Sequence, residues 1–365
     1  VASRARADEE ESTGEKNRTI MATMTAGPST ASGGPVTVPW VEKYRPKTLE
    51  EVAAHKDIVE TVKRLVDENK LPHLLLYGPP GTGKTSMILA IAKQMYGKRA
   101  AQMTLHLNAS DARGIDVVRN DIQGFASTRH IFNKGVKLII LDECDAMTND
   151  AQFALRRIME KYVANVRFAL ICNQVGKVIP ALQSRCTRFR FSPLPAEFVT
   201  QRLAHIAAEE AGDHPEAARA AAVGAVVKLA GGDMRRALNL LQSVAAGASA
   251  NGAGLSAQAV YATSGQTQPE VVAAILKLLR EAPFGECFSE LRAIQEREGF
   301  ALVDLLGELV NLLLAAESKE SGAWPPQALQ DLLAKLADLE YNLSGSVTEK
   351  LQLGGLVGIF VEHRP

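Results

Sequence analysis

The chain has 365 residues, which allows two or three domains and a sizeable core. Lysine plus arginine and aspartate plus glutamate each total 41, so the formal net charge is zero. The net charge therefore gives no indication of nucleic-acid binding, and any such contact must be a local patch. The four cysteines form no Cys-x-x-Cys pair, which favours reduced thiols over disulfides or a metal site.

The first 35 residues are rich in Ala, Ser, Thr, Gly and Glu and lack apolar periodicity, so we predict disorder there. The following stretch, Val38–Pro46, is too short and mixed to predict an element of its own. Its aromatic residues and prolines indicate a stiff strap packed on the protein. An ordinary N-terminal arm and one wall of an adenine pocket, contributed by Val41 and Arg45, are equally compatible with it.

Helix and strand patterns alternate from residue 49 to residue 193. Residues 49–69 have the period of a helix pair, and a helix is also expected after Asp111. The predicted strands are Leu74–Tyr77, Met103–Leu107, Val136–Leu141, Val166–Cys172 and Arg188–Phe191, and further helices are predicted over Thr85–Tyr96 and Ala151–Tyr162. Five strands separated by helices predict an α/β fold with a parallel sheet, which we assign to a nucleotide-binding core over residues 36–195.

The stretch Gly78–Thr85 has the pattern Gly-x-x-x-x-Gly-Lys-Thr between a strand and a helix. Glycines there let backbone N–H groups close around an anion, and the helix N-terminus adds its dipole. Lys84 supplies a charge for the β- and γ-phosphates, and Thr85 a hydroxyl for Mg²⁺. The pattern therefore predicts a phosphate-binding loop.

Two acids, Asp142 and Glu143, end the apolar strand at Leu141, and Asn173 follows the next buried strand. Because the carboxyl ends of parallel strands meet at one edge, these side chains should face the ligand crevice. Asp142 is then a candidate for holding Mg²⁺ and Glu143 for polarising water. Asn173 is a candidate for orienting water or touching the γ-phosphate, although a strand-end Asn is usually a turn former.

Several arginines are either surface charges or functional groups, and composition does not separate the two. Arg185, in a loop before the last strand, is a candidate arginine finger acting on a neighbouring subunit. Arg235, near a helix start, is a candidate γ-phosphate contact. Arg113 and Arg119 are candidate contacts to a nucleic-acid backbone.

After Pro195 the strand pattern stops and helices follow. We predict a small helical domain over residues 196–248, in which Asp233 caps the third helix, and an Ala/Gly/Ser-rich linker over 249–256, although that composition already begins at Ala245. Residues 257–365 are predicted to be an all-helical packing or oligomerisation domain. Within it, Phe300–Ala316 carries Asp304, Glu308 and Asn311 on one face, so it is an amphipathic helix and we expect no membrane span.

Read together, these motifs resemble the ordered boxes of the small subunits of replication factor C, the eukaryotic sliding-clamp loader of the AAA+ class. The boxes that carry the resemblance are Trp40–Pro46, Gly78–Thr85, Asn108–Asp111, Leu141–Asp145, Ser184–Cys186 and Gly232–Asn239. The resemblance covers residues 38–244 strongly and the C-terminal helices weakly. It implies an AAA+ core, a helical lid, and a helical collar that makes a hetero-pentamer.

The resemblance also implies roles for single residues. The adenine pocket would be lined by Val41, Arg45, Val52 and Ala53. ATP phosphates and Mg²⁺ would be bound by Gly78, Pro79, Pro80, Gly81, Thr82, Gly83, Lys84 and Thr85, with Asp142 as a second metal ligand. Catalysis would involve Lys84, Asp142 and Glu143, with Asn173 and Arg235 as γ-phosphate sensors and Arg185 acting in trans. Arg113 and Arg119 would follow the DNA backbone.

Two departures from the family pattern stand out. Cys144 replaces the alanine that is usual in the acidic box, Leu141–Asp145. Because both side chains are small, we expect Asp142 and Glu143 to be unaffected. Ala53-Ala54-His55 stands where Tyr-Gly-Gln is usual, which removes an aromatic expected to contact adenine.

The implied function is a nuclear, DNA- and clamp-stimulated ATPase that opens a PCNA-type sliding clamp and loads it on primer-template DNA, in replication and repair. One alternative is a hexameric AAA+ DNA motor of the branch-migration helicase type, which shares the phosphate loop and acids but gives no reason for the Ser-Arg-Cys box or a collar. Another is a scaffold that binds nucleotide without hydrolysing it.

Overall fold

The structure is a computed structural model that describes residues 38–52, 55–68, 70–110, 118–128, 135–251, 254–317, 324–345 and 348–364. It divides into two units, residues 1–43 and 44–365. The predictions for residues 1–35, Ala53 and Arg113 lie outside the described residues, as does the side chain of Arg119.

Residues 38–43 of the first unit contain one helical turn, α2 (Trp40–Lys43), where we predicted no element. The backbone N–H groups of Glu42 and Lys43 both donate to Pro39 O at 3.0 Å. The fixed φ of a proline just before the turn favours this start, which is why a mixed sequence without apolar periodicity still turns. Trp40 is buried.

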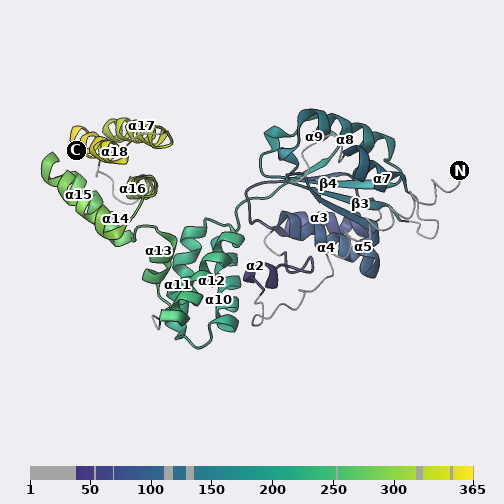
Figure 1. The fold of residues 1–365 in the computed structure, drawn as a ribbon, viewed down its shortest axis with the longest axis horizontal. Coiled ribbons are helices and arrows are strands. Elements are labelled where there is room, and N and C mark those ends of the chain that lie inside the picture. The colour runs from purple at the N-terminus through teal and green to yellow at the C-terminus, as the bar shows by residue number, and fades with distance from the viewer. Residues whose placement is uncertain are drawn as a thin grey trace, which may run out of the picture. The chain divides into compact units, whose positions relative to one another are not determined.

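Five parallel strands form the sheet of the second unit (Figure 1), as predicted. In space they run in the order β2 (Thr104–Asn108), β3 (Lys137–Asp142), β4 (Val166–Cys172), β1 (Leu74–Tyr77) and β5 (Thr187–Arg190). The predicted bounds hold for β1 and β4, and the other strands are shifted by about one residue. Because β1 lies beside β4, the phosphate loop and Asn173 leave the sheet from neighbouring strands.

Alternate residues of each strand enter two separate cores. Leu75, Ile139 and Phe168 face one core, whereas Leu74 and Leu138 face the other. The first face is covered by α7 (Gln123–Ser127), α8 (Asn149–Lys161) and α9 (Pro180–Gln183), and the second by α3 (Lys56–Asp67) and α4 (Lys84–Tyr96) (Figure 1). Shorter turns are α5 (Ala100–Met103), η2 (Gly97–Arg99), η3 (Val118–Ile122), η4 (Cys144–Ala146) and η5 (Val175–Lys177). The predicted helix pair over 49–69 is wrong, because turns precede a single helix, α3.

Four helices form the small helical domain, the lid: α10 (Ala196–Glu210), α11 (Glu216–Ala230), α12 (Met234–Asn251) and α13 (Ala257–Ser264). The Ala/Gly/Ser-rich stretch read as linker is helical through Asn251, because alanine has the highest helix propensity and offsets the single glycine. Helix α13 packs on α11 and α12, so it belongs to the lid and not to the collar, where we had placed it.

The last five helices share one apolar core. They are α14 (Pro269–Glu281), α15 (Phe284–Glu298), α16 (Leu302–Glu317), α17 (Pro326–Leu343) and α18 (Glu349–Glu362). Leucines dominate this core, among them Leu305, Leu332 and Leu356. Within the part of the chain that the structure describes, none of the helices combines the length and apolarity that crossing a bilayer requires.

Leu170→Ala should destabilise the α/β core, because Leu170 is fully buried in the central strand β4. Deleting a buried leucine side chain costs about 2–5 kcal/mol. Urea unfolding monitored by circular dichroism measures the change. Leu351→Ala, the same truncation at a site that is 69% exposed, is the control and should leave the curve nearly unchanged. Equal curves for the two variants would contradict the placement of Leu170.

Candidate functional site

The phosphate loop runs from Gly78 to Gly83 between β1 and α4. Its three glycines have positive φ angles, 144° at Gly78, 67° at Gly81 and 93° at Gly83. A Cβ on Gly78 would lie 2.1 Å from the carbonyl oxygen of Phe191, so only glycine fits against the end of β5. The loop is therefore held in a conformation that leaves its backbone N–H groups available to an anion.

The ammonium group of Lys84 lies inside this loop, and the residue as a whole is 6% exposed. Its Nζ donates to Gly78 O at 2.8 Å, to Pro79 O at 2.7 Å and to Asn173 Oδ1 at 3.1 Å. Burial lowers the pKa of Lys84, while the nearby carboxylate of Asp142 opposes that shift. The structure thus brings Lys84 and Asn173, two candidate site residues, into direct contact.

Asp142 and Thr85 meet beside the lysine. Thr85 Oγ1 donates to Asp142 Oδ2 at 2.7 Å, and the backbone N–H of Glu143 donates to Asp142 Oδ1 at 3.0 Å. Glu143 itself is exposed, and its φ of 53° is the only positive value at a non-glycine position among the described residues. Such a conformation is uncommon outside glycine and is frequent at functional sites.

Cys144 points the other way, into the core below the acids, where it is 2% exposed. The neighbouring Cys172 thiol and burial both raise the pKa of Cys144. The substitution for the usual alanine is therefore accommodated by core packing.

Asp145 fixes the segment that carries Asn173, a role that the sequence did not indicate. Its Oδ2 accepts from the backbone N–H groups of Asn173 at 3.3 Å and Gln174 at 3.1 Å. The contact joins the turn after β3 to the end of β4, so the acidic box and the amide move as one piece. No local sequence pattern predicts a contact between a carboxylate and a backbone N–H 28 residues away in the chain.

The lid touches the loop at Gly81. Asp233 Oδ1 caps α12, as predicted, by accepting from the backbone N–H groups of Arg235 at 2.8 Å and Arg236 at 3.1 Å. Met234 N donates to Gly81 O at 3.3 Å, and a Cβ on Gly81 would lie 1.6 Å from Asp233 Oδ1. Arg235 is exposed on this first turn, and its charge contributes to lowering the pKa of Lys84, which places it within electrostatic range of the loop.

The predicted adenine-pocket residues are only partly placed. Val52 is buried, and its Cγ1 would lie 3.8 Å from a Cβ on Gly83, so it packs beside the loop. The pKa of His106 on β2 is lowered by burial and by the charge of Arg45, so Arg45 lies near that strand. Val41 lies in α2 of the first unit, and Ala53 is outside the described residues.

Tyr44 contacts the lid, which the sequence did not indicate. Its hydroxyl lies 2.8 Å from Glu209 Oε2 and 2.5 Å from Glu210 Oε1, both at the end of α10, and Arg202 Nη2 donates to Tyr44 O at 3.5 Å. Burial and the two carboxylates raise the pKa of Tyr44, so the phenol stays protonated and donates.

Arg185 contacts its own α8 and α9, in contrast to the groups that gather around Lys84. Its Nη1 donates to Ala181 O at 2.7 Å and its Nη2 pairs with Glu160. Arg185 is therefore bonded outside the cluster of residues around Lys84.

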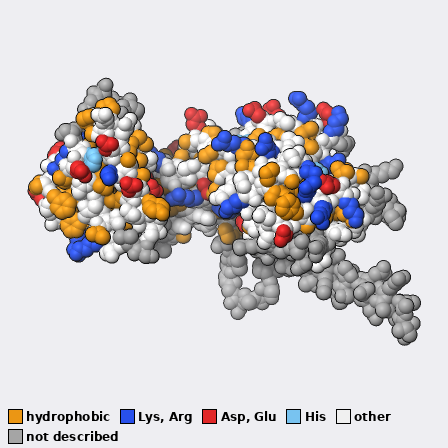
Figure 2. Space-filling model, turned by 90° about the horizontal axis from the view of Figure 1, so that it is seen from above, with side chains coloured by type: hydrophobic (Ala, Val, Ile, Leu, Met, Phe, Trp, Pro, Cys, Tyr) orange, Lys and Arg blue, Asp and Glu red, His pale blue; other side chains and the backbone are white. Residues whose placement is uncertain are grey.

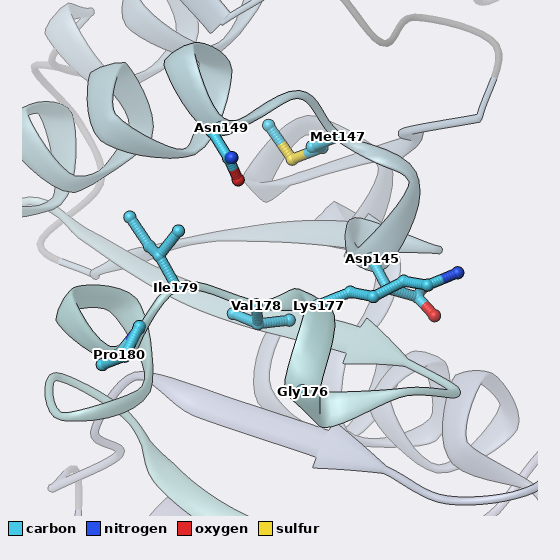
Figure 3. A pocket seen from close by; sticks show the side chains of 8 residues that line it. All are labelled: Asp145, Met147, Asn149, Gly176, Lys177, Val178, Ile179 and Pro180. Atoms are coloured by element: carbon cyan, nitrogen blue, oxygen red, sulfur yellow. The ribbon is translucent and has the colours of Figure 1, made fainter.

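A hollow of about 400 Å³ opens beside the acidic box, between the segments that follow β3 and β4. Figure 3 shows Met147 and Asn149 on one side and Val178, Ile179 and Pro180 on the other, with Asp145 and Lys177 at one end. Its lining mixes apolar and charged groups and does not include Lys84 or Thr85, so it is separate from the phosphate loop.

The side chains around the loop suit a nucleoside triphosphate with a divalent cation. The glycine loop is too tight for a Cβ at Gly78, and the Lys84 ammonium lies buried within it. The Thr85 hydroxyl and the Asp142 carboxylate meet at one side. A hydroxyl with a carboxylate is a donor set that Mg²⁺ accepts, and the lysine with backbone N–H groups suits phosphate oxygens.

Comparison with known proteins agrees with this chemistry. Residues 74–194 match the model of the ATPase family associated with various cellular activities (AAA), and residues 267–358 match that of the replication factor C C-terminal domain. The chain is 47% identical to replication factor C subunit 3 of Oryza sativa subsp. japonica, over 92% of this chain and 90% of that protein. Replication factor C subunit 5 of Homo sapiens is 48% identical, over 88% and 91%. Replication factor C subunit 3 of Saccharomyces cerevisiae is 47% identical, over 88% and 92%.

Among solved structures, the Thermotoga maritima RuvB Holliday junction branch migration motor aligns with a TM-score of 0.47 and 18% identity. The alignment covers 68% of this chain and 85% of that one, and the likeness is too distant to bear on function.

Gly81→Ala should release the lid from the loop, because its Cβ would overlap the Asp233 carboxylate, which cannot turn away without giving up the cap of α12. Loss of the Met234 N–H bond to Gly81 O should speed hydrogen–deuterium exchange at that amide by about fivefold to tenfold. Gly265→Ala is the control, since Gly265 has a φ of 68° and no neighbour within 4 Å. Unchanged exchange at Met234 in Gly81→Ala would contradict this contact.

Proposed function

This chain belongs to the replication factor C family and is an ATPase subunit, and from that premise we propose that it acts in a hetero-pentamer which loads a sliding clamp. The clamp would be a PCNA-type ring, opened and placed on primer-template DNA in the nucleus during replication and repair. Residues 126–129 and Ala146–Thr148 resemble the subunit numbered 3 in fungi and 5 in animals, and the relatives reported above carry these names.

The nucleotide is proposed to be ATP with Mg²⁺. The observation that carries this is the convergence of Lys84, Thr85, Asp142 and Asn173 through direct hydrogen bonds. Lys84 and the glycine loop would bind the phosphates, while Thr85 and Asp142 would hold the metal. Bound Mg²⁺ supplies positive charge that stabilises the transferring phosphoryl group.

The other residues would act around that centre. Glu143 is exposed at the strand end, where it can accept a proton from water. Asn173 and Arg235 would report on the γ-phosphate from the sheet and from the lid. Val41, Arg45, Val52 and Ala53 remain proposed adenine contacts.

Arg185 is proposed to act in trans, on ATP bound by the adjacent subunit. Its support is that Arg185 bonds to Glu160 and Ala181 instead of joining the cluster at Lys84. An arginine is suited to the role because its planar, always-charged fork matches phosphate oxygens.

DNA would be held by its backbone, without reading of the bases. Arg113 and Arg119 are the proposed contacts. Figure 2 shows Lys and Arg side chains gathered over the α/β core on the face in view, which fits a local attraction in a chain of zero net charge.

A hexameric DNA motor remains the alternative, but the relatives at 46–49% identity support the loader. Native mass measurement of the assembled protein separates the two. A hetero-pentamer supports the loader, and a homo-hexamer would overturn it.

Lys84→Ala should abolish ATP binding at this site, with at least a hundredfold loss of affinity, because it removes the charge that the loop is built around. Titration of the full chain with a fluorescent ATP analogue measures this. Lys93→Ala, which removes an exposed lysine about two and a half turns along the same helix, is the control and should bind normally. Normal binding by Lys84→Ala would refute the assignment of the loop.

Arg185→Ala should leave this subunit's own ATP binding intact and lower the ATPase rate of the assembled complex by about tenfold or more at the neighbouring site. Binding is measured by the same titration and turnover by phosphate release. Arg188→Ala, which removes an exposed arginine on β5, is the matched control. Unchanged turnover in Arg185→Ala would show that the trans role is wrong.

A further inference from the structure

Glu160, at the end of α8, contacts two arginines through one oxygen. Its Oε1 lies 3.2 Å from Arg156 Nε, one helical turn earlier, and also accepts from Arg185 Nη2. Arg156, followed by Arg185, lowers the pKa of Glu160, so the carboxylate is ionised at neutral pH. Arg185 is thereby held by two groups of its own chain, the Glu160 carboxylate and the Ala181 carbonyl oxygen.

The two contacts leave most of the arginine available. A guanidinium has five N–H donors, and Arg185 uses one on Nη1 and one on Nη2 in these contacts, so three remain. Because the guanidinium is planar and rigid, fixing two of its nitrogens also fixes the directions of the remaining N–H bonds. Arg185 can therefore stay bound to Glu160 while it donates to another group.

We propose that Glu160 is a positioning residue for Arg185, holding the guanidinium so that its remaining donors meet the phosphates bound by the adjacent subunit. The inference rests on the trans role proposed above for Arg185. Glu160 would not touch the nucleotide itself. It would act only through the arginine, and this separates it from the residues around Lys84.

The exposure of the pair favours orientation over stability. The side chains of Arg185 and Glu160 are 31% and 44% exposed, and ion pairs this open to solvent contribute little to folding. Such a pair can still affect the reaction rate by orienting the Arg185 side chain. The side chain then loses its rotamer freedom before the reaction and not during it. Glu160 links the arginine to α8, which begins four residues after Asp145 of the acidic box.

The experiment compares Glu160→Ala, Glu160→Gln, Arg185→Ala and the double variant Glu160→Ala/Arg185→Ala in the assembled complex, by steady-state ATPase measurement. The quantity of interest is the part of the ATPase rate that Arg185→Ala removes. Glu160→Ala should lower that part by about twofold to tenfold in kcat, with KM for ATP unchanged. Glu160→Gln keeps an acceptor oxygen and should recover part of the loss. The double variant should be no slower than Arg185→Ala alone.

Glu296→Ala is the matched control, because Glu296 pairs with Arg292 at 2.9 Å in the same i, i+4 arrangement but holds no third group. It should leave turnover unchanged. If Arg185→Ala lowers turnover but Glu160→Ala does not, the positioning role is wrong and the trans role stands. If Glu160→Ala slows the complex further in the Arg185→Ala background, Glu160 acts structurally and the proposal fails. If Arg185→Ala itself has no effect, the trans role fails and this inference with it.

Discussion

The buried charge of Lys84 is the interaction on which the rest of the site depends. A cation taken out of water is costly unless its donors are satisfied, and here the acceptors are two loop carbonyls and the Asn173 amide. These acceptors come from segments that follow β1 and β4, so they meet only when the two strands pair in register. The parallel sheet is therefore a condition of the site as well as its support.

The same dependence explains which parts of the molecule could be predicted from the sequence. The bounds of β4 were predicted because six of its seven residues are apolar, the exception being Arg167, as expected for a strand buried on both faces. The placing of Asp142 and Asn173 at the ligand edge of the sheet followed from one rule, that parallel strands end at a common edge, whereas the bond between Lys84 and Asn173 was not predicted. Where no such rule applied, as for α2 and the end of α12, composition pointed the wrong way. An alanine-rich helix and an alanine-rich linker look alike in sequence, and only the packing of α12 on α11 distinguishes them.

Side-chain contacts between distant exposed residues could not be predicted at all. Tyr44 meets Glu209 across 165 residues, and Arg185 meets Glu160 across 25. Neither pair follows a periodic pattern in the sequence. Tyr44 and Arg185 lie in turns, and their partners are ordinary polar residues of helices. The identity of Arg185 as a candidate came from its box, whereas what holds it came only from the structure.

The lid is joined to the phosphate loop by direct contacts at Gly81. Asp233 caps α12 with the same oxygen that crowds Gly81, and Met234 N bonds to Gly81 O. Any change in the loop at Gly81 must therefore move the first turn of α12, which carries Arg235. On the other side of the sheet edge, Asp145 ties Asn173 to the acidic box, and α8 leads from that box to Glu160. One end of this path lies at this chain's own phosphate loop and the other at Arg185, so contacts within one α/β core connect the two halves of the site that we propose neighbouring subunits share.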